Sequence, residues 1–166
     1  MNDIALSGLA KQLVLAELLT DKSAQQAYQQ AQRQKLSLVS YLVQNKLVKS
    51  RQVAEIASEH FGMALLDLHC LDKESQPKGL VSEKLVRQHH ALPLWRRGNK
   101  LFVGVSDPTN HQAINDIQFS TGLSTEALLV EDDKLGEAID KFFEAANSGM
   151  EDLADVDLDG VDVQAV

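Results

Sequence analysis

The sequence is short of the residues that build disulfides, metal centres and membrane spans. Its single cysteine, Cys70, can form no internal disulfide and has no CxxC partner, so we expect a free structural thiol in a reducing compartment. No apolar run approaches the ~20 residues of a transmembrane helix, and the N-terminus lacks the basic region and apolar core of a signal peptide. We therefore expect a cytoplasmic protein without direct membrane insertion.

The signatures of common catalytic sites are also missing. The sequence has no GxxxxGK[ST] phosphate loop, no GxGxxG, no GxSxG and no HExxH. No two histidines have the i, i+4 spacing of zinc ligands on a predicted helix, and His69-Cys70 would supply only half of a metal site. We predict no catalytic residue, no metal site and no cofactor in these residues, and we expect them to be inert toward ATP.

Basic charge is scarce, and acidic charge is concentrated at one end. The net charge of −8 argues against nucleic acid as a partner, because phosphate binding needs clustered Lys and Arg. The last residues carry no Lys or Arg but six acids, which are Glu151, Asp152, Asp155, Asp157, Asp159 and Asp162. From about Ala145 we expect disorder, and we interpret residues 147–166 as an acidic linker to a further region.

Residues 1–62 show the 3.6-residue apolar period of helices throughout. Candidate N-cap residues divide them into four helices, since Ser7, Thr20, Ser37 and Ser50 each precede an apolar-periodic run. Gly62 then follows the last run, as a C-terminal cap would. We predict a helical subdomain over residues 1–62.

This helical half contains an internal repeat. When Leu13-Val14 is placed over Leu42-Val43, Leu18-Leu19 falls on Leu47-Val48. Both later pairs lie where a unit turns from its first helix to its second. The favoured interpretation is that they close a small core. The alternative is a hydrophobic groove for a ligand or a partner helix.

Residues 63–146 read as a small α/β subdomain with alternating strand and helix patterns. Its predicted elements are a strand over Met63 to Leu68, a polar loop from His69 to Gly79, a helix from about Ser82 to His89, a hairpin over 91–105, a helix from Pro108 to about Thr121, a strand over Ala127 to Val130 and a helix from Asp133. Together with the first half, this pattern predicts an α+β fold.

The hairpin is the clearest element. Leu92 and Leu94 precede the turn, Leu101, Val103 and Val105 follow it, and Gly98-Asn99 between them tolerates the positive φ of a tight primed turn. Two strands alone are marginal in water, so we expect helices to cover one face.

The hairpin tip adds an aromatic residue next to two cations. Trp95 with Arg96 and Arg97 could stack a base or grip a phosphate. The favoured interpretation is a sheet tryptophan beside a solvated turn, because a hairpin tip is where charge is normally placed. If the tip acts at all, docking of an acidic surface is the expected role.

The repeat and the second half together resemble the MshEN domain at the N-terminus of type II secretion and type IV pilus assembly ATPases. The repeat Leu-Val-x-x-x-Leu-Leu/Val is similar to that of the domain, as are LVSEKLVRQH, LPLWRRGNKLFVGVSDP, AINDIQFSTG and LVEDDKL. The resemblance covers about residues 5 to 146. It implies the non-catalytic N-terminal regulatory and docking domain of a hexameric pilus extension ATPase, with ATP and Mg bound in domains beyond residue 166. The partners it implies are a PilZ-type adaptor and inner-membrane platform proteins, which would hold the protein peripherally at the inner membrane.

Many MshEN domains bind cyclic di-GMP through a repeated RLGxxLVxxG motif, and this sequence departs from it. Gly8 and Ser37 stand at the arginines, and the four glycines are replaced by Ala10, Glu17, Val39 and Lys46. The apolar positions remain. The resemblance therefore favours a protein-docking role, with a cyclic di-GMP receptor as the alternative and an independent enzyme disfavoured. The predicted partner surface comprises Leu18, Leu19, Leu47, Val48, Arg96 and Arg97.

Overall fold

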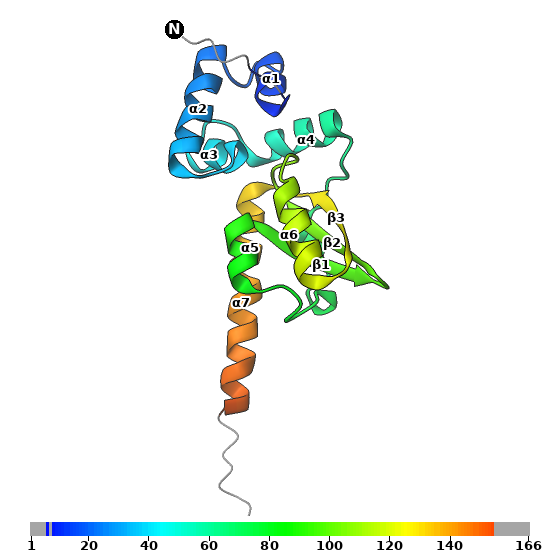
Figure 1. The fold of residues 1–166 in the computed structure, drawn as a ribbon. Coiled ribbons are helices and arrows are strands. Elements are labelled where there is room, and N and C mark those ends of the chain that lie inside the picture. Colours follow the sequence, from blue (N-terminus) through cyan, green and yellow to red (C-terminus); the bar gives the residue numbers. More distant parts are fainter. Residues whose placement is uncertain (1–5, 7, 155–166) are drawn as a thin grey trace, which may run out of the picture.

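The computed structural model describes Leu6 and residues 8–154. Its N-terminal unit contains the helices α1 (Gly8–Leu15), α2 (Asp21–Gln34), α3 (Leu38–Gln44) and α4 (Ser50–Phe61). Figure 1 shows these four helices gathered at one end of a small sheet.

The caps of this unit follow the sequence with one exception. Thr20 accepts a hydrogen bond from the Ser23 amide in a reciprocal capping box, the Ser37 side chain accepts one from the Ser40 amide, and Gly62 ends α4 with φ +64°. The prediction for Ser50 is wrong. Lys49 is the N-cap of α4, and Ser50 is buried inside the first turn. The predicted cap Ser7 lies outside the described residues.

The second unit places a mixed three-stranded sheet between helices. It contains α5 (Glu83–His89), β1 (Ala91–Arg97), β2 (Lys100–Val105), α6 (His111–Thr121), β3 (Ser124–Leu129) and α7 (Asp132–Ala154), with short 3₁₀ helices at Leu68–Cys70 and Lys73–Ser75. The strand order is β1-β2-β3, with β2 antiparallel to β1 and parallel to β3. The predicted α+β fold is confirmed.

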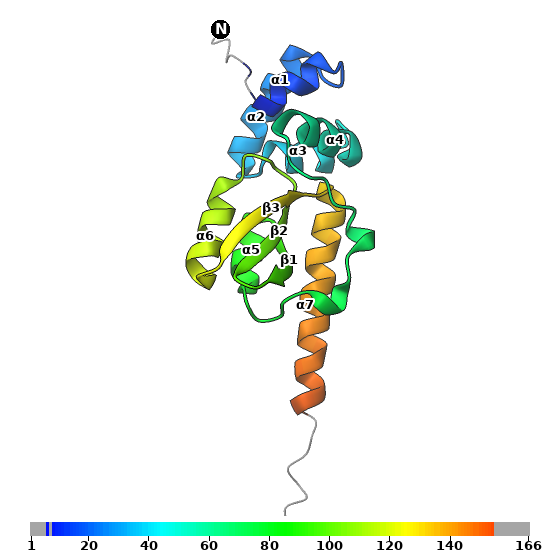
Figure 2. The ribbon, with the colours of Figure 1, turned by 90° about the vertical axis from the view of Figure 1, so that its right-hand side faces the viewer.

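The hairpin forms as predicted, with a two-residue turn. Arg97 pairs with Lys100 across Gly98-Asn99, and Gly98 has φ +60°. Helices cover the sheet as expected, and they do so on both faces, because residues 91–94 are all buried. Figure 2 shows the reason, since α6 lies on one side of the sheet and α7 on the other.

Several elements differ from the sequence prediction. The stretch from Met63 to Leu68 is no full strand, because Leu65 makes only an isolated parallel bridge with Leu129. Helix α6 begins at His111 rather than Pro108, since Asp107 Oδ1 accepts the Thr109 amide in a turn of its own. Strand β3 starts three residues earlier than expected, at Ser124.

Helix α7 continues to Ala154, so the prediction of disorder from about Ala145 is wrong for residues 145–154. A helix that is already packed extends by one hydrogen bond per residue at little cost, even where its composition is acidic. Residues 155–166, the rest of the predicted linker, lie outside the described residues. The predicted boundaries after residues 62 and 146 stay predictions.

Each unit has its own apolar core, and the two cores meet at the end of β3. Leu129 is fully buried in the core of the helical unit, whereas the next residue, Val130, belongs to the core of the sheet. In the part of the chain that the structure describes, no helix combines the length and apolarity needed to span a membrane.

Candidate functional site

The two units of the repeat turn in the same way. Helix α1 ends with Glu17 N–H bonded to Val14 O at 2.9 Å and Leu18 N–H bonded to Leu13 O at 3.0 Å. Helix α3 ends with the equivalent pair of bonds, and both have the 5→2 and 6→1 pattern of a Schellman turn. The residue that makes each turn is left-handed, with φ +59° at Glu17 and φ +55° at Lys46.

These are two of the positions at which the cyclic di-GMP motif has glycine. A left-handed backbone favours glycine whether or not a ligand is present. Gly8 is also left-handed, with φ +59°, and no atom lies within 4 Å of where its Cβ would be.

The other motif positions lie in different surroundings. Ser37 is half-buried as the cap of α3, whereas Ala10 and Val39 are buried. Val39 belongs to the helical core, so its side chain contributes to packing in this structure.

The predicted partner residues lie in two separate places. Val48 is 6% exposed, and Leu18 and Leu19 pack against the same helical core, so the core-closing interpretation of the apolar pairs is confirmed for these three. Leu47 is 46% exposed.

Arg96 and Arg97 lie at the hairpin turn, the opposite end of the sheet from the helical unit. A strand of this length separates the two places by roughly 17–20 Å. Trp95 stacks on Phe102 with ring centroids 5.0 Å apart, and Arg96 Nε donates to Gly98 O at 2.8 Å. These contacts confirm a sheet tryptophan beside an exposed, charged turn.

A buried carboxylate joins the two units. Asp132, the first residue of α7, is 5% exposed, and its Oδ1 accepts hydrogen bonds from Ser40 Oγ at 2.8 Å and Ser106 Oγ at 2.6 Å. Ser40 lies on α3 of the helical unit, and Ser106 follows β2. His90 Nε2 lies 3.1 Å from the same oxygen, close enough for an ion pair when the ring is protonated, but without the direction of a well-formed hydrogen bond.

The surroundings of Asp132 favour its charged form. Burial raises the pKa of Asp132. The contact with His90 and the hydrogen bonds from Ser106 and Ser40 together lower it by more than burial raises it, so the pKa lies below its ordinary value. The position at the start of α7 also suits a negative charge, since the N-terminus of a helix is its positive end. Asp132 therefore holds α3, β2 and α7 together as an ionised acceptor.

Neighbouring groups add to this junction. Glu131 lies 2.9 Å from Lys134 and 3.6 Å from Arg51 of α4, and the Asp133 amide approaches Ser50 Oγ at 3.5 Å. Every pair except Glu131–Lys134 links α4 of the helical unit to the start of α7.

A polar cavity of about 600 Å³ opens beside the junction. It lies between the turn from α2 to α3, which contributes Lys35 and Ser37, and the α/β unit, which contributes Arg87, His90 and Asn110. The two serines at Asp132 donate to an ionised acid and are not activated as nucleophiles. No group of three or more His, Cys, Asp or Glu residues in the described ranges could hold a metal ion. The arrangement is suited to holding two units together rather than to chemistry.

Sequence reasoning missed this junction. Ser40 and Asp132 are 92 residues apart, and no local pattern distinguishes Asp132 from its neighbours Glu131 and Asp133. The only available signal was that an acid at the first turn of a predicted helix is well placed to accept hydrogen bonds.

Comparison with known proteins agrees with this architecture. A family model of the MshEN domain matches residues 61–149. The type IV pilus assembly ATPase PilB of Pseudomonas aeruginosa is 66% identical over 164 residues, which cover 98% of this chain and 29% of that protein. The chain thus spans less than a third of the length of this relative.

Two solved structures share the fold. The N-terminal domain of XpsE superposes with a TM-score of 0.65 at 23% identity, covering 80% of this chain and 91% of that one. A structure of MshE with cyclic di-GMP has a TM-score of 0.60 at 19% identity, covering 82% of this chain and 99% of that one. The matches are to the N-terminal MshEN/XpsE domain, which is a non-catalytic part of the ATPase PilB. Because the family model matches more than half of the sequence, the chain belongs to the MshEN domain family.

Proposed function

We propose that this chain is the regulatory and docking domain of a PilB-type pilus assembly ATPase, and that it passes the binding of a regulator such as a PilZ-type adaptor to the motor. The identity with PilB supports the setting, since it extends over 98% of the chain. In this proposal the ATP and Mg sites lie in the motor domains. The wider partners are inner-membrane platform proteins of the pilus machine, which would keep the protein at the cytoplasmic face of that membrane.

The observation that carries the relay is the Asp132 junction. A partner that contacts the helical unit pulls on α3, and Ser40 of α3 is bonded to the first residue of α7. Helix α7 then runs from the junction past the whole sheet (Figure 1). A packed helix moves as a rigid body, so a shift at its first turn is carried to its far end.

Binding of a purified PilZ-type adaptor to the 166-residue chain, measured by calorimetric titration, tests the docking role. We expect Leu47→Asp to weaken binding at least tenfold, because Leu47 combines 46% exposure with a place at the predicted surface. Phe119→Ser on α6 is the matched control, since Phe119 is 93% exposed and lies outside that surface. Loss of binding in Phe119→Ser alone would move the docking surface to α6, and no binding by the unaltered chain would refute the adaptor role.

The relay needs its own test in an ATPase that carries this domain. Ser40→Ala removes one hydrogen bond to Asp132 without touching an exposed surface. We expect the adaptor to bind as before but to lose its effect on ATP turnover. Unchanged regulation in this variant would refute the relay while leaving the docking role intact.

The second candidate function is a cyclic di-GMP receptor, which the solved structure of MshE with that nucleotide favours. The missing arginines argue against it here. Neither Gly8 nor Ser37 can provide a charged planar fork for phosphate and guanine. Two such contacts, at about 1.5–3 kcal/mol each, correspond to a loss of roughly two to four orders of magnitude in affinity.

We predict that cyclic di-GMP binds weakly or not at all. Calorimetric titration of the chain with the nucleotide is the measurement, and a dissociation constant below about 10 μM, or roughly −7 kcal/mol, would establish the receptor function instead. Arginine at positions 8 and 37 should not restore binding unless Ala10, Glu17, Val39 and Lys46 also become glycine.

A further inference from the structure

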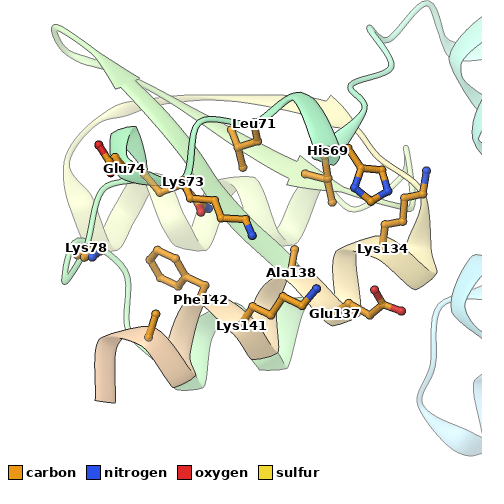
Figure 3. Close-up of a pocket in the computed structure, with 13 residues that line it drawn as sticks. His69, Leu71, Lys73, Glu74, Lys78, Lys134, Glu137, Ala138, Lys141 and Phe142 are labelled. Carbon is orange, nitrogen blue, oxygen red and sulfur yellow. The ribbon is translucent and has the colours of Figure 1, made fainter. Parts of the chain in front are cut away.

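A groove of about 390 Å³ lies along α7, from Lys134 to Ala145. One wall is the segment that carries the two 3₁₀ helices, and the other is α7, as Figure 3 shows. Its floor is apolar, because Leu71 faces Ala138 and Phe142 across the gap. Leu71, Ala138 and Phe142 are only partly buried, so the groove leaves apolar surface in contact with water.

The rim of this groove is basic in a protein whose net charge is −8. Four lysines line it, namely Lys73, Lys78, Lys134 and Lys141, against two acids, Glu74 and Glu137. Lys134 is paired with Glu131 at 2.9 Å. Lys73, Lys78 and Lys141 have no salt bridge to any residue that the structure describes.

An apolar floor under a rim of unpaired lysines fits a segment in which apolar residues alternate with carboxylates. In an extended chain, successive side chains point to opposite sides, so the apolar ones can face the floor while the acids face the rim. Residues 155–163, which follow α7, read DVDLDGVDV. The alternation is unbroken in two stretches, 155–159 and 161–163, because Gly160 shifts its phase. The apolar residues of this segment are valine and leucine, and it contains no cation.

The segment is also long enough to return to the groove. The helical rise places Phe142 about 18 Å before Ala154 along α7. A reversal over residues 155–157, where Asp suits a turn, leaves residues 158–163, which reach roughly 20 Å when extended. The tether also gives the segment an effective concentration on the order of mM, so modest contacts are sufficient.

We propose that residues 161–163 dock in this groove of the same molecule, with Val163 over Phe142, with Val161 over Ala145, which also lines the groove, and with Asp162 beside Lys141. The groove would then be an intramolecular docking site for the acidic segment that follows α7. Docking would hold that segment against the α/β unit, and any partner that occupied the groove would release it.

The single cysteine allows a direct test. Cys70 is exposed and lies between residues that line the groove, so a nitroxide spin label on it is next to the proposed site. In an isotope-labelled 166-residue chain, we expect the amide signals of residues 161–163 to lose intensity through paramagnetic broadening. Equal intensities with the oxidised and the reduced label would refute docking.

Two lysine variants with the same change of net charge provide the control. Lys141→Glu reverses a charge on the rim, whereas Lys22→Glu reverses an exposed charge on α2. We expect the broadening to disappear in Lys141→Glu and to persist in Lys22→Glu, and we expect Asp162→Lys to restore it when combined with Lys141→Glu. Raising the salt from about 0.1 M to 1 M, which shortens the Debye length from about 10 Å to 3 Å, should also reduce it.

A mixed sample identifies the source of the segment. Spin-labelled chain without the isotope is mixed with isotope-labelled chain without the spin label, so that only contacts between molecules cause broadening. No broadening in this sample supports docking within one molecule. Broadening there would overturn the proposal in favour of a second copy as the occupant, and broadening that persists in Lys141→Glu would refute the charge pairing.

Discussion

At the scale of single residues, Glu17 and Lys46 hold backbone conformations that are unfavourable for them. A left-handed conformation costs a residue with a side chain roughly 1–2 kcal/mol. The two Schellman turns nevertheless form, because the chain must reverse direction at Leu18 and at the equivalent Leu47 before the second helix of each unit starts. Each unit of the repeat thus has a turn shaped for glycine at a position where the sequence has Glu or Lys.

Glycine at either turn should therefore stabilise the protein. Glu17→Gly and Lys46→Gly each remove the cost of a left-handed backbone at a residue with a side chain. The greater freedom of glycine in the unfolded chain cancels about 0.4–1 kcal/mol of this gain. We expect a net gain of up to about 1 kcal/mol per site in the free energy of unfolding by urea. Asn45→Gly is the control, because Asn45 has φ −86° and should gain nothing. A loss of stability in both turn variants would mean that the side chains, and not the backbone, decide these turns.

Asp132 should make stability depend on pH in the acid range. Because its folded pKa lies below the ordinary value of about 3.9, its contribution is complete above that pH and is lost as the pH falls through the folded pKa. Asp132→Asn removes a charged acceptor and should cost roughly 1–3 kcal/mol at pH 7. The difference between the variant and the parent should shrink below about pH 4.

Urea unfolding at a series of pH values measures this effect. Asp133→Asn is the matched control, since Asp133 is exposed at the next position of the same helix end. A difference that stays constant down to pH 3 would show that the Asp132 charge is not what the junction uses.

At the scale of elements, the sequence predicted the features that depend on residues close together in the chain. The capping hydroxyls of Thr20 and Ser37 and the glycine at position 62 act within a few residues, and all three were found. The start of α6 was missed because Asp107 and Asn110 compete as side-chain acceptors for nearby amides, and the second one caps the helix. The junction at Asp132 was missed because its partners come from three distant segments.

The hairpin turn depends on one glycine. Gly98 is the first of two turn residues and has φ +60°, which matches the type II′ turn that favours glycine there. Gly98→Ala should destabilise the protein by roughly 1–2 kcal/mol, because the added Cβ meets no neighbour and the cost comes from the backbone alone. Asn99→Ala should be nearly neutral. Equal effects of the two changes in thermal unfolding would contradict this turn type.

At the scale of the whole molecule, the two units are joined by shared residues rather than by a flexible linker. Leu129 of β3 pairs with Val105 of β2 but is buried in the helical core, and Met63 packs against both cores. Asp132 adds a polar bridge between the same units. Composition and periodicity indicated one helical unit and one α/β unit, but they carried no information on how β3 and α7 join the two.

The joined cores predict that the chain unfolds as one body. Trp95 is the only tryptophan and reports on the sheet, whereas far-UV circular dichroism reports mainly on the helices, including the four of the N-terminal unit. We expect the two signals to follow a single urea transition, as two-state unfolding requires. Leu129→Ala should lower the free energy of unfolding reported by both signals by roughly 2–5 kcal/mol, because it opens a cavity where the cores meet. Leu13→Ala, in the middle of the helical core, is the comparison, and it should also move both. If the helical signal alone moved in either variant, the units would be independent, and a shift at α3 would have no route to α7.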